Sequence, residues 1–277
     1  MLPSVLRRNP LWQQAAALMF SLSGHRYPSS WYTPYKFREL ERILASPFDP
    51  QHLPLQYGRW LDERIVEYPW VFSRLPRGPG RLLDAGSVLN FVPLLRHPLV
   101  KEKELTIMTL APEEDCFWRR GISYLYGDLR SIPFRDDHFD YVICISTLEH
   151  IGLDNTLLYT SDAAKKENAP ESYLLALSEL RRVLRHGGSL LLTVPFGRRE
   201  VRSWIQIFDS FAIERILETF AAHKTCEIYF RYHAETGWRL SSREAAADAR
   251  YFDFRTDASW LGRPVAAEAI ACIELQK

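Results

Sequence analysis

Cysteine is scarce in this sequence, and its spacing argues against two kinds of structural framework. There are four cysteines, Cys116, Cys144, Cys226 and Cys272, and no two of them form a Cys-x-x-Cys pair. The last three lie in apolar, strand-like runs, which is typical of reduced thiols in a protein core. We therefore expect a cytoplasmic protein with neither disulfides nor a bound metal.

Excess charge of either sign is also missing. The chain has 35 basic and 34 acidic residues, which gives a formal net charge of +1. Without a basic surplus or a basic stripe, the sequence disfavours a nucleic-acid partner. With 277 residues, of which 47% are hydrophobic, the chain is long enough for one large domain with appendages.

No apolar run is long enough to span a membrane. The best candidate, Ala15–Leu22, follows two arginines and is preceded by Gln13 and Gln14, which interrupt the apolar run. It is far shorter than a bilayer requires. We expect a helix that packs on the protein, with peripheral membrane contact as the open alternative. The sequence does not define an oligomeric state.

Residues 1–79 are rich in aromatic residues and proline, and we expect them to form a helical N-terminal cap. Tyr35–Leu44 and Gly58–Val66 are predicted as short amphipathic helices, separated by the proline-rich stretch Ser46–Pro54. The aromatic side chains of this cap have two interpretations: they pack in the core, or they line a substrate pocket.

Residues 80–277 alternate apolar strands with amphipathic helices. Helices are predicted at Ser172–Arg185 and Ser210–Ala222. Strands are predicted at residues 81–83, Leu105–Thr109, Ile122–Tyr126, Tyr141–Ile145, Leu190–Val194, Cys226–Tyr232 and Ala269–Leu275. Continuous apolar strands indicate a sheet covered on both faces. The predicted fold is therefore α/β, a doubly wound seven-stranded and mostly parallel sheet with one antiparallel strand near its end.

The turn after the first strand is the most informative stretch. Asp84 ends the strand, and Gly86 follows as the residue that best tolerates a left-handed backbone. In an open parallel sheet this edge is the ligand crevice, and the next helix offers free amide groups there. The turn thus has two interpretations, a nucleotide site or an ordinary strand-to-helix connection.

Three segments together decide between these interpretations. LLDAG at Leu82–Gly86, GDLRSIPFRDDHFDYVICISTLEHI at Gly127–Ile151 and ELRRVLRHGGSLLLTVPFG at Glu179–Gly197 follow one another in this order. The set resembles the class I S-adenosylmethionine-dependent methyltransferases, of the type 11-like kind, over roughly residues 80–200. The resemblance implies a Rossmann-like methyltransferase fold with S-adenosylmethionine as the cofactor. It also implies methyl transfer to oxygen or nitrogen of a small molecule or, by a looser analogy with polysaccharide enzymes, a glycan.

The resemblance also implies which residues hold the cofactor. Asp84 and the Gly86 turn would meet its methionine end, Asp128 and the Leu129 amide its adenine, and Ser146 would lie beside the sulfonium. The cofactor-binding residues predicted in this way are Asp84, Ala85, Gly86, Asn90, Thr109, Leu110, Asp128, Leu129, Ile145 and Ser146.

Two elements of the family pattern are missing. Gly86 is followed by Ser87–Asn90, without the second glycine, so the first glycine motif is degenerate. The acid that usually holds the ribose at the end of the second strand is replaced by Thr109 and Leu110, and Glu113 comes late in the loop. Asn90 or Thr109 would serve instead. These departures motivate the alternative function, a scaffold that has kept the fold without catalysis.

His150, just past the fourth strand, is the predicted general base, with Glu149 as its orienting partner. A structural histidine is the alternative. The long segment Gly152–Pro170, which we call the insert, is either a substrate lid or a solvated loop.

Two groups of side chains are predicted to bind the substrate. Asp154, Asn155 and Tyr159 of the insert would supply its polar contacts. Arg198 and Arg199, with Arg202 close by, would suit an anionic substrate, unless they form a solvated face.

Overall fold

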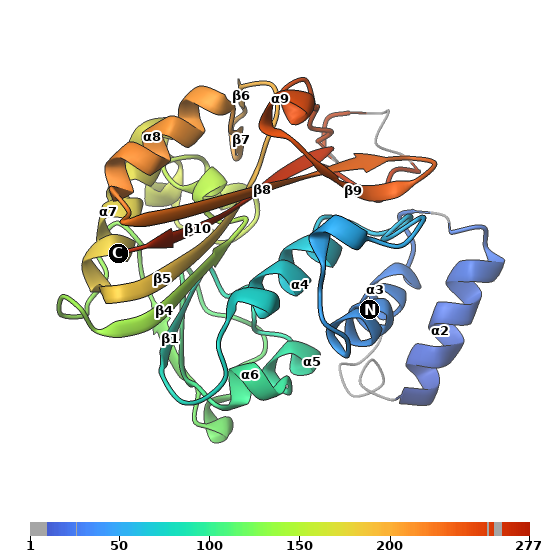
Figure 1. Ribbon diagram of the computed structural model, residues 1–277, viewed down its shortest axis with the longest axis horizontal. Coiled ribbons are helices and arrows are strands. Elements are labelled where there is room, and N and C mark those ends of the chain that lie inside the picture. The colour runs from blue at the N-terminus through green and yellow to red at the C-terminus, as the bar shows by residue number, and fades with distance from the viewer. Residues whose placement is uncertain (1–9, 26, 254, 258–261) are drawn as a thin grey trace.

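The computed structural model describes residues 10–25, 27–253, 255–257 and 262–277, and in them a twisted sheet lies between two layers of helices (Figure 1). The strand order is β3-β2-β1-β4-β5-β10-β8-β9. The strands are β1 (Arg81–Ala85), β2 (Glu104–Thr109), β3 (Ser123–Tyr126), β4 (Phe139–Ile145), β5 (Leu184–Pro195), β8 (Lys224–His233), β9 (Gly237–Ser241) and β10 (Ala269–Gln276). Every predicted strand is present, and β9 is an additional one.

The central strands pair in parallel and the late ones do not. β1 pairs in parallel with β2 and β4, β2 with β3, and β4 with β5. β10 lies antiparallel between β5 and β8, and β9 runs antiparallel to β8. The carboxyl ends of β1 to β5 therefore share one edge, which is the predicted ligand crevice.

Helices cover both faces of the sheet, as the apolar strands predicted. One face is covered by α4 (Arg64–Arg74), α5 (Val92–Leu95) and α6 (Pro98–Lys101). On the same side, α3 (Tyr32–Leu44) packs beside α4, and α2 (Pro10–Leu22) packs on α3 (Figure 1). The other is covered by α7 (Tyr173–Val183) and α8 (Ser210–Phe220). The shorter elements are α9 (Arg243–Ala246), β6 (Glu200–Val201), β7 (Gln206–Ile207), η1 (Pro50–His52), η2 (Trp118–Arg120), η3 (Leu148–His150), η4 (Asn155–Leu157), η5 (Ala163–Lys165) and η6 (Pro170–Ser172).

One predicted helix of the cap is displaced. The prediction at Gly58–Val66 is wrong, because residues 55–60 form turns and α4 begins only at Arg64. Gly58 has φ +60, and an added Cβ would lie 2.5 Å from Ile65. α4 then continues through Pro69, because Trp70 and its neighbours are buried in the core. Packing here outweighs the helix-breaking tendency of proline.

The cap and the sheet share one hydrophobic core. Ile65 and Trp70 of α4 belong to the same buried cluster as Leu82, Ile143 and Leu191 of the sheet. Within the described residues, no helix has the length and hydropathy needed to cross a membrane.

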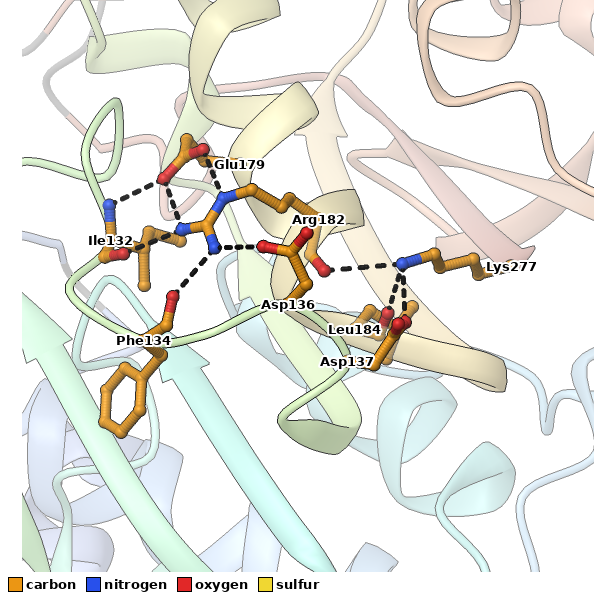
Figure 2. A network of polar contacts seen from close by, with 8 residues as sticks. All are labelled: Ile132, Phe134, Asp136, Asp137, Glu179, Arg182, Leu184 and Lys277. Atoms are coloured by element: carbon orange, nitrogen blue, oxygen red, sulfur yellow. Dashed lines mark hydrogen bonds and ion pairs between the residues drawn. The ribbon is translucent and has the colours of Figure 1, made fainter.

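The loop from β3 to β4 is fixed by an arginine from the opposite helix layer (Figure 2). Arg182 of α7 donates to the carbonyls of Ile132 and Phe134, at 2.8 and 2.7 Å, and is itself held by Glu179. Lys277 anchors the same loop through Asp137, at 2.8 Å. This network sets the path of the chain just after Asp128 and so supports one end of the crevice.

Candidate active site

A cavity of about 510 Å³ lies at the carboxyl edge of the sheet, between the strand ends and the cap. The turn after β1 and the ends of β2, β3 and β4 line it, together with side chains of α3, α4 and the insert. Its volume is in the range of small-molecule sites.

The turn after β1 is organised by Asp84. This carboxyl group is fully buried and accepts the amides of Val88 and Leu89, at 3.1 and 2.8 Å. Burial raises the pKa of Asp84 to about 7, although both hydrogen bonds oppose the shift. Asp84 therefore shapes the turn and does not line the cavity, contrary to the direct contact we predicted. Ala85 and Ile145 are likewise buried in their strands and do not line it.

Gly86 has no room for a side chain. Its φ is +120, as the turn predicted, and an added Cβ would lie 2.1 Å from Oγ1 of Thr147, after β4. The amide of Gly86 donates to the Met108 carbonyl at 2.8 Å. The turn is thus packed tightly between its two neighbouring strands, with Gly86 on the cavity wall.

The residues that we considered as partners of the ribose differ in whether they line the cavity. Thr109 and Leu110 line the cavity, as predicted, and so does Glu113, whose late position we had counted against it. Asn90 does not line the cavity, because its amide donates to Asp115 and its oxygen accepts the Tyr124 hydroxyl. Glu113 is therefore the carboxylate of the loop after β2 that lines the cavity.

Asp128 and Leu129 line the cavity at the end of β3. Arg130 binds Asp128 through Nη2 at 2.6 Å and Glu167 of the insert through Nη1 at 2.6 Å. Lys165 of the insert lies 3.6 Å from Asp128. Burial would raise the pKa of Asp128, but the hydrogen bonds from Arg130 outweigh it and lower the pKa to about 2. Asp128 is therefore a carboxylate at neutral pH.

The end of β4 is tied to the cap by a buried carboxylate. Glu67 of α4 accepts the hydroxyls of Ser146 and Thr193, at 2.6 and 2.5 Å, and pairs with Arg64 at 2.6 Å. Ser146, with φ +40, and Arg64 both line the cavity. Glu67 therefore fixes the cap against the carboxyl ends of β4 and β5, and the end of β4 is where we predicted the reaction to occur.

His150 lines the cavity and is held from behind by Trp204. Its ring stacks on the indole, with centroids 5.4 Å apart, and Nδ1 lies 2.9 Å from the Trp204 carbonyl. A carbonyl only accepts, so Nδ1 carries the proton and Nε2 keeps its lone pair. Burial, with the charge of Arg64, lowers the pKa of His150 to about 4. The imidazole is therefore neutral at physiological pH.

The comparison with known families agrees with this geometry. Residues 102–192 match the family model described as a methyltransferase domain. The chain contains an S-adenosylmethionine-dependent methyltransferase domain. The sheet and its flanking helices form the predicted Rossmann-like methyltransferase fold, and the cofactor of this domain family is S-adenosylmethionine.

Similar proteins differ from this chain over most of their sequence. An uncharacterized protein of Methanocaldococcus jannaschii is 32% identical over 87 residues, which are 31% of this chain and 29% of that protein, so the match spans less than a third of its length. A Thermotoga maritima methyltransferase, described as a possible histamine N-methyltransferase, is 13% identical with a TM-score of 0.46, covering 88% of this chain and 96% of its own. The 1,6-didemethyltoxoflavin-N1-methyltransferase of Burkholderia thailandensis is 12% identical with a TM-score of 0.45, covering 96% and 89%.

Residues of the cap also line the cavity, and we had not predicted any of them individually from the sequence. Lys36 and Phe37 of α3 and Arg64 and Tyr68 of α4 line the cavity. Lys36 is paired with Asp62 at 2.7 Å. Among the cap aromatics, Phe37 and Tyr68 reach the cavity, while Trp70 packs in the core.

Glu149 does not orient His150 in the methyltransferase domain. It is 2% exposed, its Oε2 has no hydrogen-bond partner in the described structure, and burial raises its pKa well above the usual range. The orienting group is the Trp204 carbonyl, which follows β5 and could not be paired with His150 from spacing alone.

Of the three insert residues that we predicted to bind the substrate, two line the cavity and one does not. Asn155 and Tyr159 line the cavity, and the Tyr159 ring lies 5.5 Å from that of His150. Asp154 does not line it, because its carboxylate caps the turn at Thr156, 3.1 Å from the amide. The insert is built from short turns and crosses the cavity edge.

The arginines after β5 do not line the cavity of the methyltransferase domain. Arg198 donates to the Asp248 carbonyl at 3.1 Å, and Arg199 donates to the Ile207 carbonyl at 3.1 Å. Arg202 pairs with Glu200 and Asp257. The arginines that we predicted to bind an anionic substrate therefore lie outside the cavity and are already hydrogen-bonded or paired within the protein. In the described part of the chain, no three His, Cys, Asp or Glu side chains are arranged to hold a metal.

Proposed function

We propose that this protein transfers the methyl group of S-adenosylmethionine to an oxygen or nitrogen atom of a small molecule or a glycan unit that enters the cavity. The observation that supports the proposal is that residues at the strand ends, His150 and residues of the cap all line the same cavity. When bound, the cofactor supplies an electrophilic methyl group on its sulfonium.

The residues present fit this cofactor. Asp128 and the backbone at Leu129 suit the adenine, and Glu113 with Thr109 suits the ribose hydroxyls, since carboxylates are strong acceptors. Gly86 lets the chain approach the methionine end closely, because any larger residue would meet Thr147. The order of these groups follows the strand order β3-β2-β1-β4 along the edge.

The acceptor would lie between His150 and the cap. Nε2 of the neutral imidazole can take the proton that an acceptor hydroxyl or ammonium group loses. Phe37, Tyr68 and Tyr159 offer flat apolar surfaces beside it, and Lys36 and Arg64 offer donors. The cap and the insert would therefore determine which acceptor binds, and would hold it in line for transfer.

Calorimetric titration with S-adenosylmethionine and S-adenosylhomocysteine tests the proposal before any acceptor is known. The wild type should bind both, and Gly86→Val should bind neither, because its side chain would overlap Thr147. Gly187→Val is the matched control, since Gly187 also has positive φ, +74, but no atom lies within 4 Å of the added Cβ. A wild type that binds neither compound would contradict this function and favour a non-catalytic scaffold.

A further inference from the structure

The positively charged side chains on the cap side of the cavity are already paired. Lys36 of α3 lies 2.7 Å from Asp62, and Arg64 of α4 lies 2.6 Å from Glu67. Glu67 is fully buried, and the side chains of both pairs are largely shielded from solvent. An anion that entered here would meet the carboxylate of each pair as well as its cation, so it would gain little attraction for the hydration that it loses. The cap side of the cavity therefore disfavours an anionic acceptor.

The cations on the insert side are paired as well. Arg130 lies 2.6 Å from both Asp128 and Glu167, and Lys165 lies 3.6 Å from Asp128. Together with the two cations of the cap, these are all the lysines and arginines that line the cavity in the described part of the chain. The remaining lining carboxylate, Glu113, follows β2, which lies on the opposite side of β1 from β4. An acceptor at the end of β4 thus lies away from this carboxylate, and a cationic acceptor is disfavoured too.

Aromatic rings line the cap and insert sides of the cavity. The rings of Phe37 and Phe91 have centroids 5.0 Å apart, and the ring of Tyr159 lies beside the imidazole of His150. Tyr68 donates its hydroxyl to a main-chain carbonyl of the turn after β1, at 2.8 Å, so its polar end is occupied. Phe91 is 43% and Tyr159 47% exposed, although both line the cavity. Exposed rings of this kind favour a ligand that itself presents a flat apolar ring.

We propose that the acceptor is an uncharged aromatic compound that carries a hydroxyl or amino group, and that the Lys36–Asp62 pair excludes its anionic analogues. This inference rests on the proposed function, because it names the substrate class of that same site. In the transfer, the acceptor oxygen or nitrogen forms a bond to the methyl carbon and loses its proton to Nε2 of His150, while the sulfonium sulfur keeps the electron pair of the bond that breaks.

Three probes separate the effect of charge from that of the ring. At neutral pH, 2-naphthol is an uncharged aromatic compound, 2-naphthoate has the same rings with a carboxylate, and methyl β-glucoside is uncharged but has no aromatic ring. Each is titrated calorimetrically into the full chain saturated with S-adenosylhomocysteine. The wild type should bind 2-naphthol at least about tenfold more tightly than either of the other two probes.

Asp62→Asn releases Lys36 and keeps an oxygen for the amide of Arg64, which Asp62 accepts at 3.2 Å. The variant should bind 2-naphthoate about tenfold more tightly than the wild type does, the usual scale of a hydrogen bond to a charged group, with 2-naphthol affinity unchanged. The double variant Lys36→Met/Asp62→Asn removes both charges and should return to the wild-type preference. Glu39→Gln is the matched control, because Glu39 lies on the same helix as Lys36 and pairs with Arg42, outside the cavity.

The possible results distinguish this inference from the proposed function. A wild type that binds 2-naphthoate or methyl β-glucoside as tightly as 2-naphthol would overturn the inference, and this comparison holds even if Asp62→Asn fails to fold. Unchanged 2-naphthoate affinity in a folded Asp62→Asn variant would overturn the role of the ion pair. Binding of S-adenosylhomocysteine without binding of any probe would overturn the aromatic acceptor and leave the proposed function intact. A wild type that does not bind S-adenosylhomocysteine would overturn both.

Discussion

One carbonyl oxygen determines the protonation chemistry of His150. The Trp204 carbonyl holds the proton on Nδ1, and burial lowers the pKa of the ring from 6.5 to about 4. As pH falls through 6.5, the unfolded chain takes up a proton at this position and the folded protein does not. The contribution of His150 to stability is therefore complete above pH 6.5 and is lost as pH falls toward 4.

His150→Ala should lower turnover by roughly 100-fold, the usual scale for a general base, while cofactor affinity stays close to that of the wild type. The variant should also lose less stability than the wild type between pH 6.5 and 4. Turnover, affinity and melting temperature on one preparation check this. His138→Ala is the control, because His138 also stacks on an aromatic ring, Phe134, but does not line the cavity. If His150→Ala loses affinity and stability together with turnover, His150 is structural.

The sequence predicted residues at strand ends better than the partners of those residues. Gly86, Asp128, Ser146 and His150 line the cavity, because a parallel sheet brings the ends of its strands to one edge. The role of Asp84 was not predictable in this way. Its carboxylate accepts hydrogen bonds from two amides of the turn, and these bonds form only because the turn is tight. The apolar pattern of a strand does not predict how tight the following turn is.

An arginine links the insert to the sheet at the Asp128 end of the cavity. Arg130 joins Asp128, after β3, to Glu167, and both partners are only partly buried. Such pairs contribute about 1 kcal/mol or less to global stability. Their effect is therefore expected on the local opening of the insert and not on the folding of the molecule.

Glu167→Gln should speed amide hydrogen exchange within residues 152–170 by severalfold while changing the melting temperature little. Glu171→Gln is the matched control, because Glu171 pairs with Arg199 at 3.5 Å, outside the cavity. Exchange measured by mass spectrometry on peptides of the insert checks this. Unchanged exchange in Glu167→Gln would show that other contacts close the insert.

Apolar strands were predictable, and elements that depend on distant packing were not. The core strands are short apolar runs, and their length distinguishes them from buried helices. β9 was missed because GWRLS is short and half polar; it exists as an edge strand on β8, with Trp238 donating to the Leu61 carbonyl of the cap. α4 was misplaced because the predicted helix began at Gly58 and ended at Val66, before Pro69, whereas α4 begins at Arg64 and continues through Pro69.

Cap and sheet should unfold as one unit, because they share a core and the buried Glu67. Removing the carboxylate leaves Arg64, Ser146 and Thr193 without their common partner.

Glu67→Ala should therefore cost about 3–5 kcal/mol in the free energy of unfolding. Glu67→Gln, which keeps an acceptor oxygen, should cost less. Urea unfolding followed by tryptophan fluorescence and by circular dichroism checks this, with a single shared transition expected. Two separated transitions in the wild type would contradict the coupling.

The position of β10 sets the timing of folding during synthesis. β10 is the last strand of the chain order but lies between β5 and β8, and Cys272 within it packs in the same core as Trp70 of the cap. Until residues 269–276 have left the ribosome, β5 and β8 both present open strand edges, and the cap faces an unfinished core. We therefore expect the nascent protein to be most prone to aggregation, and most dependent on chaperones, until these residues have emerged from the ribosome.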